Sequence, residues 1–407
     1  MWTMRNLKLL LVTEYFWPDQ AGTGHLLSAL MAYLKQHHGD WLIDVLTTRR
    51  LYRGSPNEAL PKAEVWQGIR IKRLSSLRSG RDSFLRRAFS DLLFSIRATI
   101  RVVVSGHDVI VLVTNPPLMP LLVALLGSLR RQRLLYIIHD LYPDVPVALG
   151  LWRADSLFVR FLVKLQKVAL RKAQRVVVLG RCMREHLINA YGIEPGKIEV
   201  IPNWATLPAE DPTSKSARSG ATFNVVYSGN LGQFHDFQTI LNGAELLRDH
   251  PFIRFYIVGD GARANWLHEE VARRGLSNVT LRSFLPDMEF RQLLLDAHLG
   301  LVTLEPRMEG LGVPSKTYNL LAMGILLLAI LGENSEVARI IDEHQLGYRV
   351  DHGDAASLAR CILDAHNNPE KWAEMSNRAF AYAKREAVLD RAAHQYAQVL
   401  KTIVSLP

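Results

Sequence analysis

Residues 7–34, LKLLLVTEYFWPDQAGTGHLLSALMAYL, contain the pattern that decides the fold. The mostly apolar run Leu7–Val12 leads into a glycine-containing loop, after which Leu26–Leu34 repeats apolar residues at helical spacing. Near-continuous apolar runs are typical of strands buried on both faces of a parallel sheet. The stretch therefore predicts a buried strand, a loop and a covering helix.

The same alternation continues through the first half of the chain. Further runs typical of buried strands are Ile43–Thr47, Val109–Val113, Leu134–Ile138, Val176–Leu179 and Ile198–Ile201. The run Val109–Leu126 has about the minimum length needed to span a membrane, but its polar centre and three prolines favour a strand and a separate short helix.

A second alternation follows a linker rich in Ser, Thr, Pro and Asp between Ala205 and Phe223. Its expected strands are Val225–Tyr227, Phe255–Val258, Val279–Leu281, Gly300–Thr303 and Ile325–Ile330, and its expected helices include Phe237–Arg248, Ala264–Arg274 and Phe290–Ala297. We expect an α/β protein with two Rossmann-like domains facing an interdomain cleft. The predicted boundaries are 1–205, 206–385, and a C-terminal helix at 386–407 that packs back toward the first domain.

Length and composition agree with two globular cores, because the chain has 407 residues and is 48% hydrophobic. Its cysteines, Cys182 and Cys361, have no nearby CxxC or histidine companions. This argues against a zinc site or a disulfide framework and fits a reducing cytosol. The N-terminus lacks a signal-peptide pattern, so we expect a cytoplasmic protein.

Positive charge is concentrated in the first half. Residues 1–205 hold 29 Lys and Arg against 15 Asp and Glu, whereas the remainder holds 20 against 24. Two stretches there, Phe84–Arg101 and Leu157–Arg175, combine apolar faces with basic ones. These patterns indicate interfacial helices on an anionic membrane, although core packing with a solvated charged face gives the same pattern.

Glycine-rich loops follow several expected strands. Gly22 and Gly24 follow the first strand, Ser228–Gly232 opens the second domain, and Gly259–Gly261 follows its next strand. Glycine lets backbone amides approach a phosphate or sugar closely, although each loop could simply need glycine for a turn. A third glycine and an acidic residue for a dinucleotide are missing after Gly24, so binding of NAD is disfavoured.

Two further residues are candidates for chemistry. His139 stands at the end of an expected strand, where it could contact a sugar hydroxyl or serve as a structural histidine. Lys316 stands in the first turn of an expected helix with Ser315 as its N-cap and Gly324 as its stop. A cation is unfavourable at that end of the dipole. The sequence holds no Asp-x-Asp pair, so a metal is not expected, and Lys316 could neutralise a diphosphate.

In order and spacing, a set of motifs resembles the family 4 retaining glycosyltransferases of the GT-B fold, especially bacterial exopolysaccharide enzymes of the colanic-acid type. The motifs cover nearly the whole chain. They are Gly22 with Gly24, TNPP at Thr114–Pro117, HDLYPD at His139–Asp144, IPNW at Ile201–Trp204, YSGNLG at Tyr227–Gly232, VGDG at Val258–Gly261 and VPSKTYNLLAMG at Val313–Gly324.

The resemblance implies transfer of a hexose from a nucleotide-diphosphate sugar to a hydroxyl, with retention and without metal or other cofactor. It implies catalytic roles for His139, Lys316 and Glu309, the last against the donor sugar. Donor-binding residues implied by the motifs are Gly22, Gly24, Gly229, Asn230, Gly259, Asp260, Gly261, Ser315 and Asn319. His139 would position or hydrogen-bond the sugar, and no protein nucleophile is required.

The chain departs from the family pattern in two places. Asn319 stands where many members have the second glutamate of a Glu-x7-Glu motif, and strict spacing would place Leu311, not Glu309, at the first. Asn230 and His235 stand where relatives place Arg and Lys. Neither side chain is reliably cationic at pH 7, so the neutralising charge would fall on Lys316.

The expected partners are a nucleotide sugar, a lipid-linked or glycan acceptor, and an anionic membrane surface at the cytosolic face, with no nucleic acid. The resulting hypothesis is a peripheral membrane hexosyltransferase in surface-polysaccharide biosynthesis. A soluble transferase acting on a small molecule is one alternative. A non-catalytic or nucleic-acid-binding protein with the same scaffold is the other, motivated by Asn230, Asn319 and the basic first half.

Overall fold

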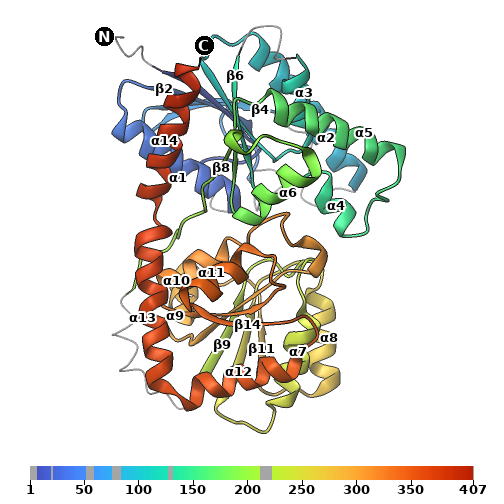
Figure 1. Cartoon of the computed structure of the whole chain (residues 1–407), viewed down its shortest axis with the longest axis vertical. Helices are drawn as coiled ribbons and strands as arrows, with labels where there is room; N and C mark the ends of the chain where they lie inside the picture. Colours follow the sequence, from blue (N-terminus) through green and yellow to red (C-terminus); the bar gives the residue numbers. More distant parts are fainter. Residues whose placement is uncertain are drawn as a thin grey trace. The chain divides into compact units, whose positions relative to one another are not determined.

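The computed structural model describes residues 7–19, 22–51, 59–75, 84–126, 132–210 and 222–406. The chain divides into two compact units, one made of Met1–Pro202 with Leu389–Pro407 and the other of Asn203–Val388 (Figure 1). The observed division therefore follows Pro202 and Val388. The expected linker lies mostly outside the described residues.

The first unit alternates strands and helices. Its strands are β1 (Lys8–Val12), β2 (Leu42–Thr48), β3 (Ala63–Trp66), β4 (Ile69–Leu74), β5 (Val109–Val113), β6 (Arg133–Ile138), β7 (Arg175–Val178) and β8 (Ile198–Val200). Its helices are α1 (Gly22–His37), α2 (Phe84–Val103), α3 (Leu118–Leu126), α4 (Asp144–Ala148), α5 (Leu157–Lys172), α6 (Arg181–Tyr191) and α14 (Leu389–Ser405), with a 3₁₀ turn at Pro195–Lys197.

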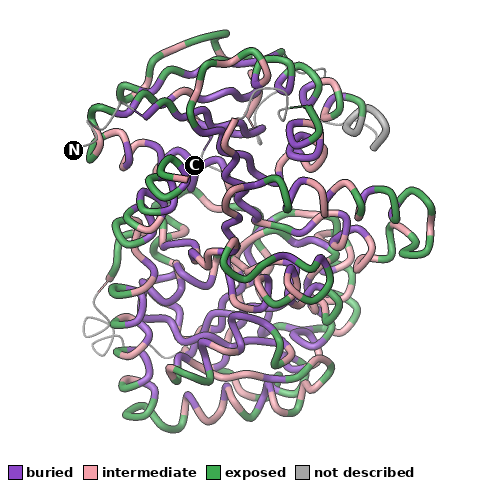
Figure 2. The backbone as a smooth tube through the Cα atoms, turned by 45° about the horizontal axis from the view of Figure 1, so that its top comes forward, coloured by how far each residue is buried: buried purple, intermediate pink, exposed green. Residues whose placement is uncertain are grey.

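Its described strands form a sheet in the order β3-β4-β2-β1-β5-β6-β7-β8, parallel except for the β3–β4 pair. All five residues of β5 are buried. In Figure 2 the strands of the unit are mostly purple, as expected where helices cover both faces. Helix α3 packs against α2 and α5, whereas α1 packs against α14 (Figure 1).

The C-terminal helix α14 belongs to the first unit although the chain reaches it from the second. It packs on α1, β5 and β6. The Tyr33 hydroxyl donates to Asp390, and Arg133 donates from Nη2 to the carbonyl of Leu406 at 2.6 Å. These contacts hold both ends of the helix against the unit.

The second unit repeats the alternation. Its strands are β9 (Phe223–Ser228), β10 (Ile253–Val258), β11 (Val279–Arg282), β12 (Leu299–Thr303), β13 (Leu326–Ile330) and β14 (Gly347–Val350). Its helices are α7 (Phe237–Leu246), α8 (Ala264–Arg274), α9 (Asp287–Leu295), α10 (Lys316–Ala322), α11 (Glu336–His344), α12 (Ala355–Asn367) and α13 (Pro369–Glu386), with a 3₁₀ turn at Pro306–Met308.

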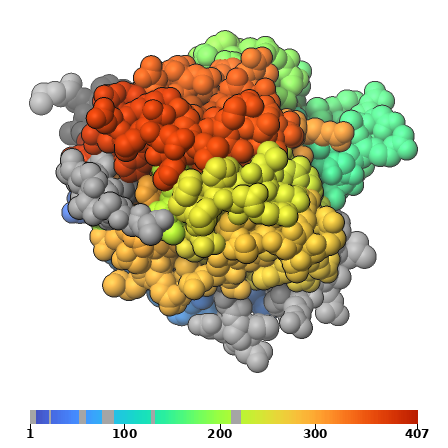
Figure 3. Space-filling model, turned by 90° about the horizontal axis from the view of Figure 1, so that it is seen from below, coloured from blue at the N-terminus to red at the C-terminus, as the bar shows by residue number. Residues whose placement is uncertain are grey.

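The described strands of this unit form a wholly parallel sheet in the order β11-β10-β9-β12-β13-β14. Both β12 and β13 are buried along their whole length. Helix α13 packs with α10 and α11, and α7 packs with α8 and α12. In Figure 3, α12 in orange-red lies against α7 in yellow. The strand order reverses beside β9, where ligands bind in sheets of this type.

Local sequence signals set the helix ends. Asp236 and Ser335 accept hydrogen bonds from the backbone amides of Thr239 and Ala338 at the starts of α7 and α11. Helix α8 ends at Gly275, whose φ of +62° is left-handed. These capping residues fix where α7 and α11 begin and where α8 ends.

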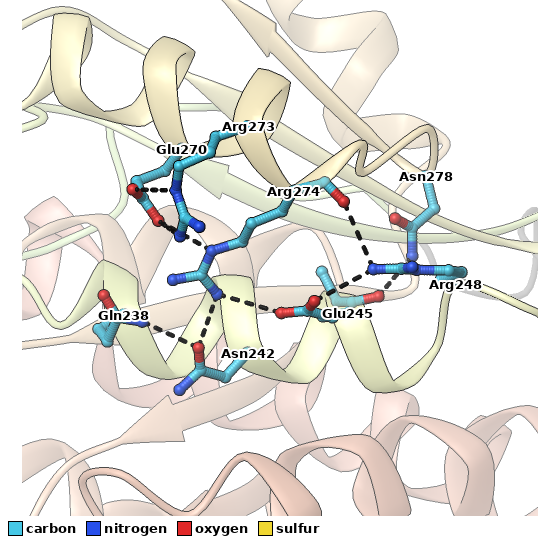
Figure 4. A network of polar contacts seen from close by, with 9 residues as sticks. Gln238, Asn242, Glu245, Arg248, Glu270, Arg273, Arg274 and Asn278 are labelled. Carbon is cyan, nitrogen blue, oxygen red and sulfur yellow. Dashed lines mark hydrogen bonds and ion pairs between the residues drawn. The ribbon is translucent and has the colours of Figure 1, made fainter.

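A polar network joins α7 to α8 (Figure 4). Arg274, whose side chain is 10% exposed, donates to Glu270 at 2.9 Å, to Asn242 at 2.8 Å and to Glu245 at 3.3 Å. Asn278 donates to the carbonyl of Ala244 at 2.8 Å. A little-exposed guanidinium with several partners holds the helices in register more firmly than an isolated surface pair would.

Most predicted strands are confirmed within one or two residues, and Val109–Leu126 is a strand followed by a helix, as expected. Strands β3, β4 and β14 were not predicted from the sequence, because their polar or alternating residues lie at or near sheet edges. No helix in the described ranges is long and apolar enough to cross a membrane.

Candidate functional site

The two glycine loops of the second unit interlock at the carboxyl edge of β9 and β10. The amide of Leu231 donates to the carbonyl of Asp260 at 2.9 Å. A Cβ atom on Gly259 would lie 1.8 Å from the carbonyl oxygen of Gly229, and one on Gly261 would lie 2.5 Å from Oδ1 of Asn230. All three glycines have positive φ. The loops therefore require glycine for both conformation and close approach, and the predicted residues there lie together.

Lys316 points into this site from the start of α10. Its Nζ lies 3.6 Å from the centroid of the Tyr227 ring and 3.2 Å from the position of a Cβ atom on Gly229. The stem is partly accessible, but Nζ is buried and has no hydrogen-bond partner among the described residues. Burial lowers the pKa of Lys316 from 10.5 to about 7. An ammonium in this position lacks the anion that would stabilise it.

Two described neighbours of Lys316, Tyr227 and His235, are not cationic at pH 7. Tyr227 donates from its hydroxyl to the carbonyl of Asn230 at 2.8 Å, and burial raises its pKa. His235 lies with Nδ1 2.6 Å from the carbonyl oxygen of Thr303. Burial and the neighbouring Lys316 lower the pKa of His235 to about 3, so this imidazole is neutral at pH 7.

Ser315 and the helix that follows differ from the sequence-based expectation. Ser315 precedes Lys316 but makes no side-chain cap bond, because its own φ and ψ of −64° and −25° are already helical. Gly324 has the expected left-handed φ of +61°. Helix α10 spans seven residues.

Glu309 lies beside the loop that follows β13. Its Oε1 accepts a hydrogen bond from the amide of Gly332 at 2.5 Å, and a Cβ atom on Gly332 would lie 2.3 Å from that oxygen. Leu311 is a buried core residue with 5% exposure. Glu309 therefore places a carboxylate at this edge, held by a backbone donor, whereas Leu311 belongs to the core.

Asn319 makes contacts that the sequence did not predict. Its Oδ1 accepts from the amides of Thr206 at 2.7 Å and Leu207 at 3.1 Å, and its Nδ2 donates to the Thr206 hydroxyl at 3.1 Å. The amide thus ties the segment after Ala205 to α10. Its acceptor oxygen is already engaged, so a role at a ribose diol would require these bonds to exchange.

In the first unit, Gly22 and Gly24 lie in the first turn of α1 rather than in a loop. The expectation of a loop at these residues was wrong, because α1 begins at Gly22, where a left-handed φ of +50° favours glycine. A Cβ atom on Gly24 would lie 3.0 Å from Cβ of Tyr15, so this glycine permits close packing of the helix on the segment after β1. The N-terminus of α1 follows the carboxyl end of β1, as in phosphate-binding α/β units.

His139 follows β6, and its amide donates to the hydroxyl of Thr114 in the TNPP motif at 3.2 Å. Its Nε2 is buried without a hydrogen-bond partner among the described residues. Burial lowers the pKa of His139 to about 4, so a neutral imidazole is present at pH 7. Such a ring can donate or accept a hydrogen bond but is not a cation.

Another member of the HDLYPD motif is structural. Asp144 accepts hydrogen bonds from Nε2 of His186 at 2.9 Å and from the hydroxyl of Tyr191 at 2.5 Å. It therefore joins α4 to α6, and each of its carboxylate oxygens accepts from a side chain of α6. In the described part of the chain, no three His, Cys, Asp or Glu side chains gather as metal ligands would.

Each unit is a Rossmann-like layer whose candidate residues lie at the carboxyl edge of its sheet, where ligands bind in open α/β sheets. The family model for the glycosyl transferase 4-like domain matches residues 22–204, and that for glycosyl transferases group 1 matches residues 222–368. The chain belongs to these family 4 glycosyltransferases and has the GT-B fold.

Named relatives agree with this assignment. WbjE of Pseudomonas aeruginosa, named a probable glycosyltransferase, is 28% identical over 87% of this chain and 88% of its own. WcaI of Escherichia coli strain K12, named for colanic acid biosynthesis, is 26% identical over 49% and 51%. The structure of Anabaena HepE in complex with UDP-glucose superposes with a TM-score of 0.68 at 16% identity, covering 97% of this chain and 100% of HepE.

Proposed function

We propose that this glycosyltransferase transfers a hexose from a nucleotide-diphosphate sugar to a hydroxyl of a lipid-linked acceptor, with retention and without metal, in surface-polysaccharide biosynthesis. The name of WcaI supports the polysaccharide setting, and the UDP-glucose complex of HepE supports the donor class. The observation that carries the proposal is the buried, unpartnered Nζ of Lys316 beside the interlocked glycine loops.

In the proposed reaction, the bond between the anomeric carbon and the leaving phosphate oxygen breaks. The acceptor hydroxyl attacks from the same face, and its proton passes to the leaving phosphate, so no protein nucleophile is involved. Lys316 stabilises the charge that develops on the diphosphate. Glu309 accepts from hydroxyls of the donor sugar, and His139 positions the sugar by hydrogen bonding.

A panel of nucleotide sugars tests the proposal. UDP-glucose, UDP-N-acetylglucosamine, GDP-mannose and dTDP-glucose are incubated with the protein, and release of the nucleoside diphosphate is followed with and without EDTA and a polyprenyl-phosphate-linked acceptor. We expect saturable hydrolysis of one donor, faster release with acceptor, and no loss in EDTA. Absence of both binding and turnover across the panel would refute the proposed function.

The first unit supports the membrane part of the proposal. On α2, Phe89, Ile96 and Ile100 are exposed at helical spacing, and on α5, Phe158 and Phe161 are more than half exposed. Helix α3 packs against both. Arg97, Arg101, Arg160 and Lys164 are exposed on the same two helices. Apolar side chains next to cations fit an anionic lipid interface.

A double substitution, Phe158→Ser with Phe161→Ser, should weaken binding to phosphatidylglycerol vesicles by about tenfold or more, because an aromatic side chain fully buried in an apolar phase contributes roughly 1.5–3 kcal/mol. Flotation of full-length protein with these vesicles measures the effect. Val65→Ser, at an exposed position on β3, is the matched control and should bind as wild type. Failure of the wild type to float with anionic vesicles would contradict the membrane role.

A further inference from the structure

His352 lies between two carboxylates at the carboxyl edge of the second unit. Its Nδ1 is 3.3 Å from Oδ2 of Asp236, and its Nε2 is 3.9 Å from Oε1 of Glu309. Asp236 precedes α7, Glu309 follows the turn after β12, and His352 follows β14. Three loops separated widely in sequence thus bring one imidazole between two acids, a feature that no sequence motif indicates.

The Asp236 side of this arrangement is firmly fixed. Asp236 accepts from the amide of Thr239 at 3.0 Å and from its hydroxyl at 2.6 Å, and the Thr239 hydroxyl in turn accepts from the amide of Gly353 at 2.8 Å. Burial opposes ionisation of Asp236, but hydrogen bonds from His352 and Thr239 outweigh it and lower the pKa to about 2. An ionised Asp236 therefore accepts a hydrogen bond from the Nδ1–H group of His352 and sets the orientation of the ring.

On the side that faces Glu309, the second ring nitrogen of His352 makes no hydrogen bond to the described residues. Nε2 of His352 is buried and has no hydrogen-bond partner in the described part of the protein. It faces an oxygen of Glu309 from just beyond hydrogen-bonding distance, while the same oxygen accepts from the amide of Gly332. Both residues are little exposed, with side chains 18% and 14% accessible. A small movement would give this carboxylate oxygen a second donor.

We propose that His352 is a positioning residue for Glu309: with donor bound, the ring donates from Nδ1 to Asp236 and from Nε2 to Glu309, fixing the carboxylate that receives the sugar hydroxyls. Donation from both nitrogens requires the imidazolium form. This inference rests on the proposed function. Since His352 acts through Glu309, substituting His352 should slow turnover of the nucleotide sugar and leave binding of the nucleoside diphosphate unchanged.

The test compares His352→Ala, His352→Gln and Glu309→Gln with the exposed control His268→Ala on α8. The turnover probe is the panel sugar that the wild type hydrolyses fastest, and the binding probe is the matching free nucleoside diphosphate, UDP for a UDP-sugar. His352→Ala should lower kcat by about tenfold or more and change the diphosphate Kd by less than about twofold. His352→Gln, whose amide can still donate, should recover much of the loss.

The double variant His352→Ala with Glu309→Gln should be no slower than Glu309→Gln alone, because residues acting as one unit are not additive. The inference would be overturned by any of three results: a kcat in the double variant lowered by the product of the two single effects, a wild-type kcat in His352→Ala, or a kcat in His352→Gln as low as that of His352→Ala. If His352→Ala does not fold, the glutamine variant and its double with Glu309→Gln decide the result. A wild type inactive on every panel sugar would instead refute the proposed function itself.

Discussion

Lys316→Met is expected to stabilise the ligand-free protein while lowering turnover by about 100-fold or more. Burial lowers the pKa of Lys316 from 10.5 to about 7, and Nζ has no hydrogen-bond partner in the described residues. Each pKa unit corresponds to about 1.4 kcal/mol, so removing the ammonium should add on the order of 4 kcal/mol to the free energy of unfolding at pH 7. Methionine keeps the apolar stem in place and creates no large cavity.

The stabilisation should depend on pH in one direction. Because the pKa of Lys316 is lower in the folded chain than in the unfolded one, the unfolded chain binds more protons between pH 7 and 10.5. Wild-type stability therefore rises with pH through that window, and the advantage of the variant is full below pH 7 and shrinks toward pH 10. Urea unfolding at pH 7 and pH 9 measures both values.

Lys384→Met provides the matched control for this substitution. Its Nζ also lies over an aromatic ring, 5.3 Å from the centroid of Phe380, but the residue is exposed. Removing an exposed ammonium should change stability and turnover little. Near-wild-type turnover in Lys316→Met would contradict the role of Lys316 in stabilising the leaving diphosphate. A Lys316→Met protein less stable than wild type at pH 7 would contradict the free-energy cost assigned to burying the ammonium.

The fold was predictable where burial on both sides dictates composition. Val109–Val113 and Leu326–Ile330 are fully buried strands with a neighbouring strand on each side, and their uninterrupted apolar runs identify them. Ala63–Trp66 lies at a sheet edge, and its four residues alternate between exposed and partly buried. So short a segment without a continuous apolar run cannot be identified as a strand from its sequence pattern. The edge strand Gly347–Val350 is missed for the same reason.

The grouping of the candidate residues was predictable only where they follow one another in sequence. The glycine loops and Lys316 belong to short motifs, whereas His352 meets Asp236 across 116 positions and Gly332 meets Glu309 across 23. For Asn319 the sequence identifies a candidate donor-binding position. It does not predict that the amides of Thr206 and Leu207 donate hydrogen bonds to the side-chain oxygen of Asn319. Contacts between loops depend on the sheet order, which strand patterns alone do not give.

Binding of a nucleoside diphosphate is expected to take up close to one proton at pH 8.5. With a pKa of about 7, Lys316 is mostly neutral at that pH in the free protein. A diphosphate beside Nζ favours the ammonium and raises its pKa, so the proton comes from solvent. The Kd for UDP should therefore increase by up to about tenfold per pH unit above pH 7.5. The phosphate of UDP itself, with a pKa near 6, no longer titrates in that range, so the change reports on the protein.

Titration calorimetry in buffers of different ionisation enthalpy measures this proton uptake. The neighbours of Lys316 do not titrate in the window, because the pKa of His235 is lowered to about 3 and that of Tyr227 is raised. Lys316→Met should bind UDP more weakly at pH 7.5 and show no uptake at pH 8.5, while Lys384→Met should behave as wild type. Uptake that persists in Lys316→Met would assign the proton to another group and remove the diphosphate from the neighbourhood of Nζ.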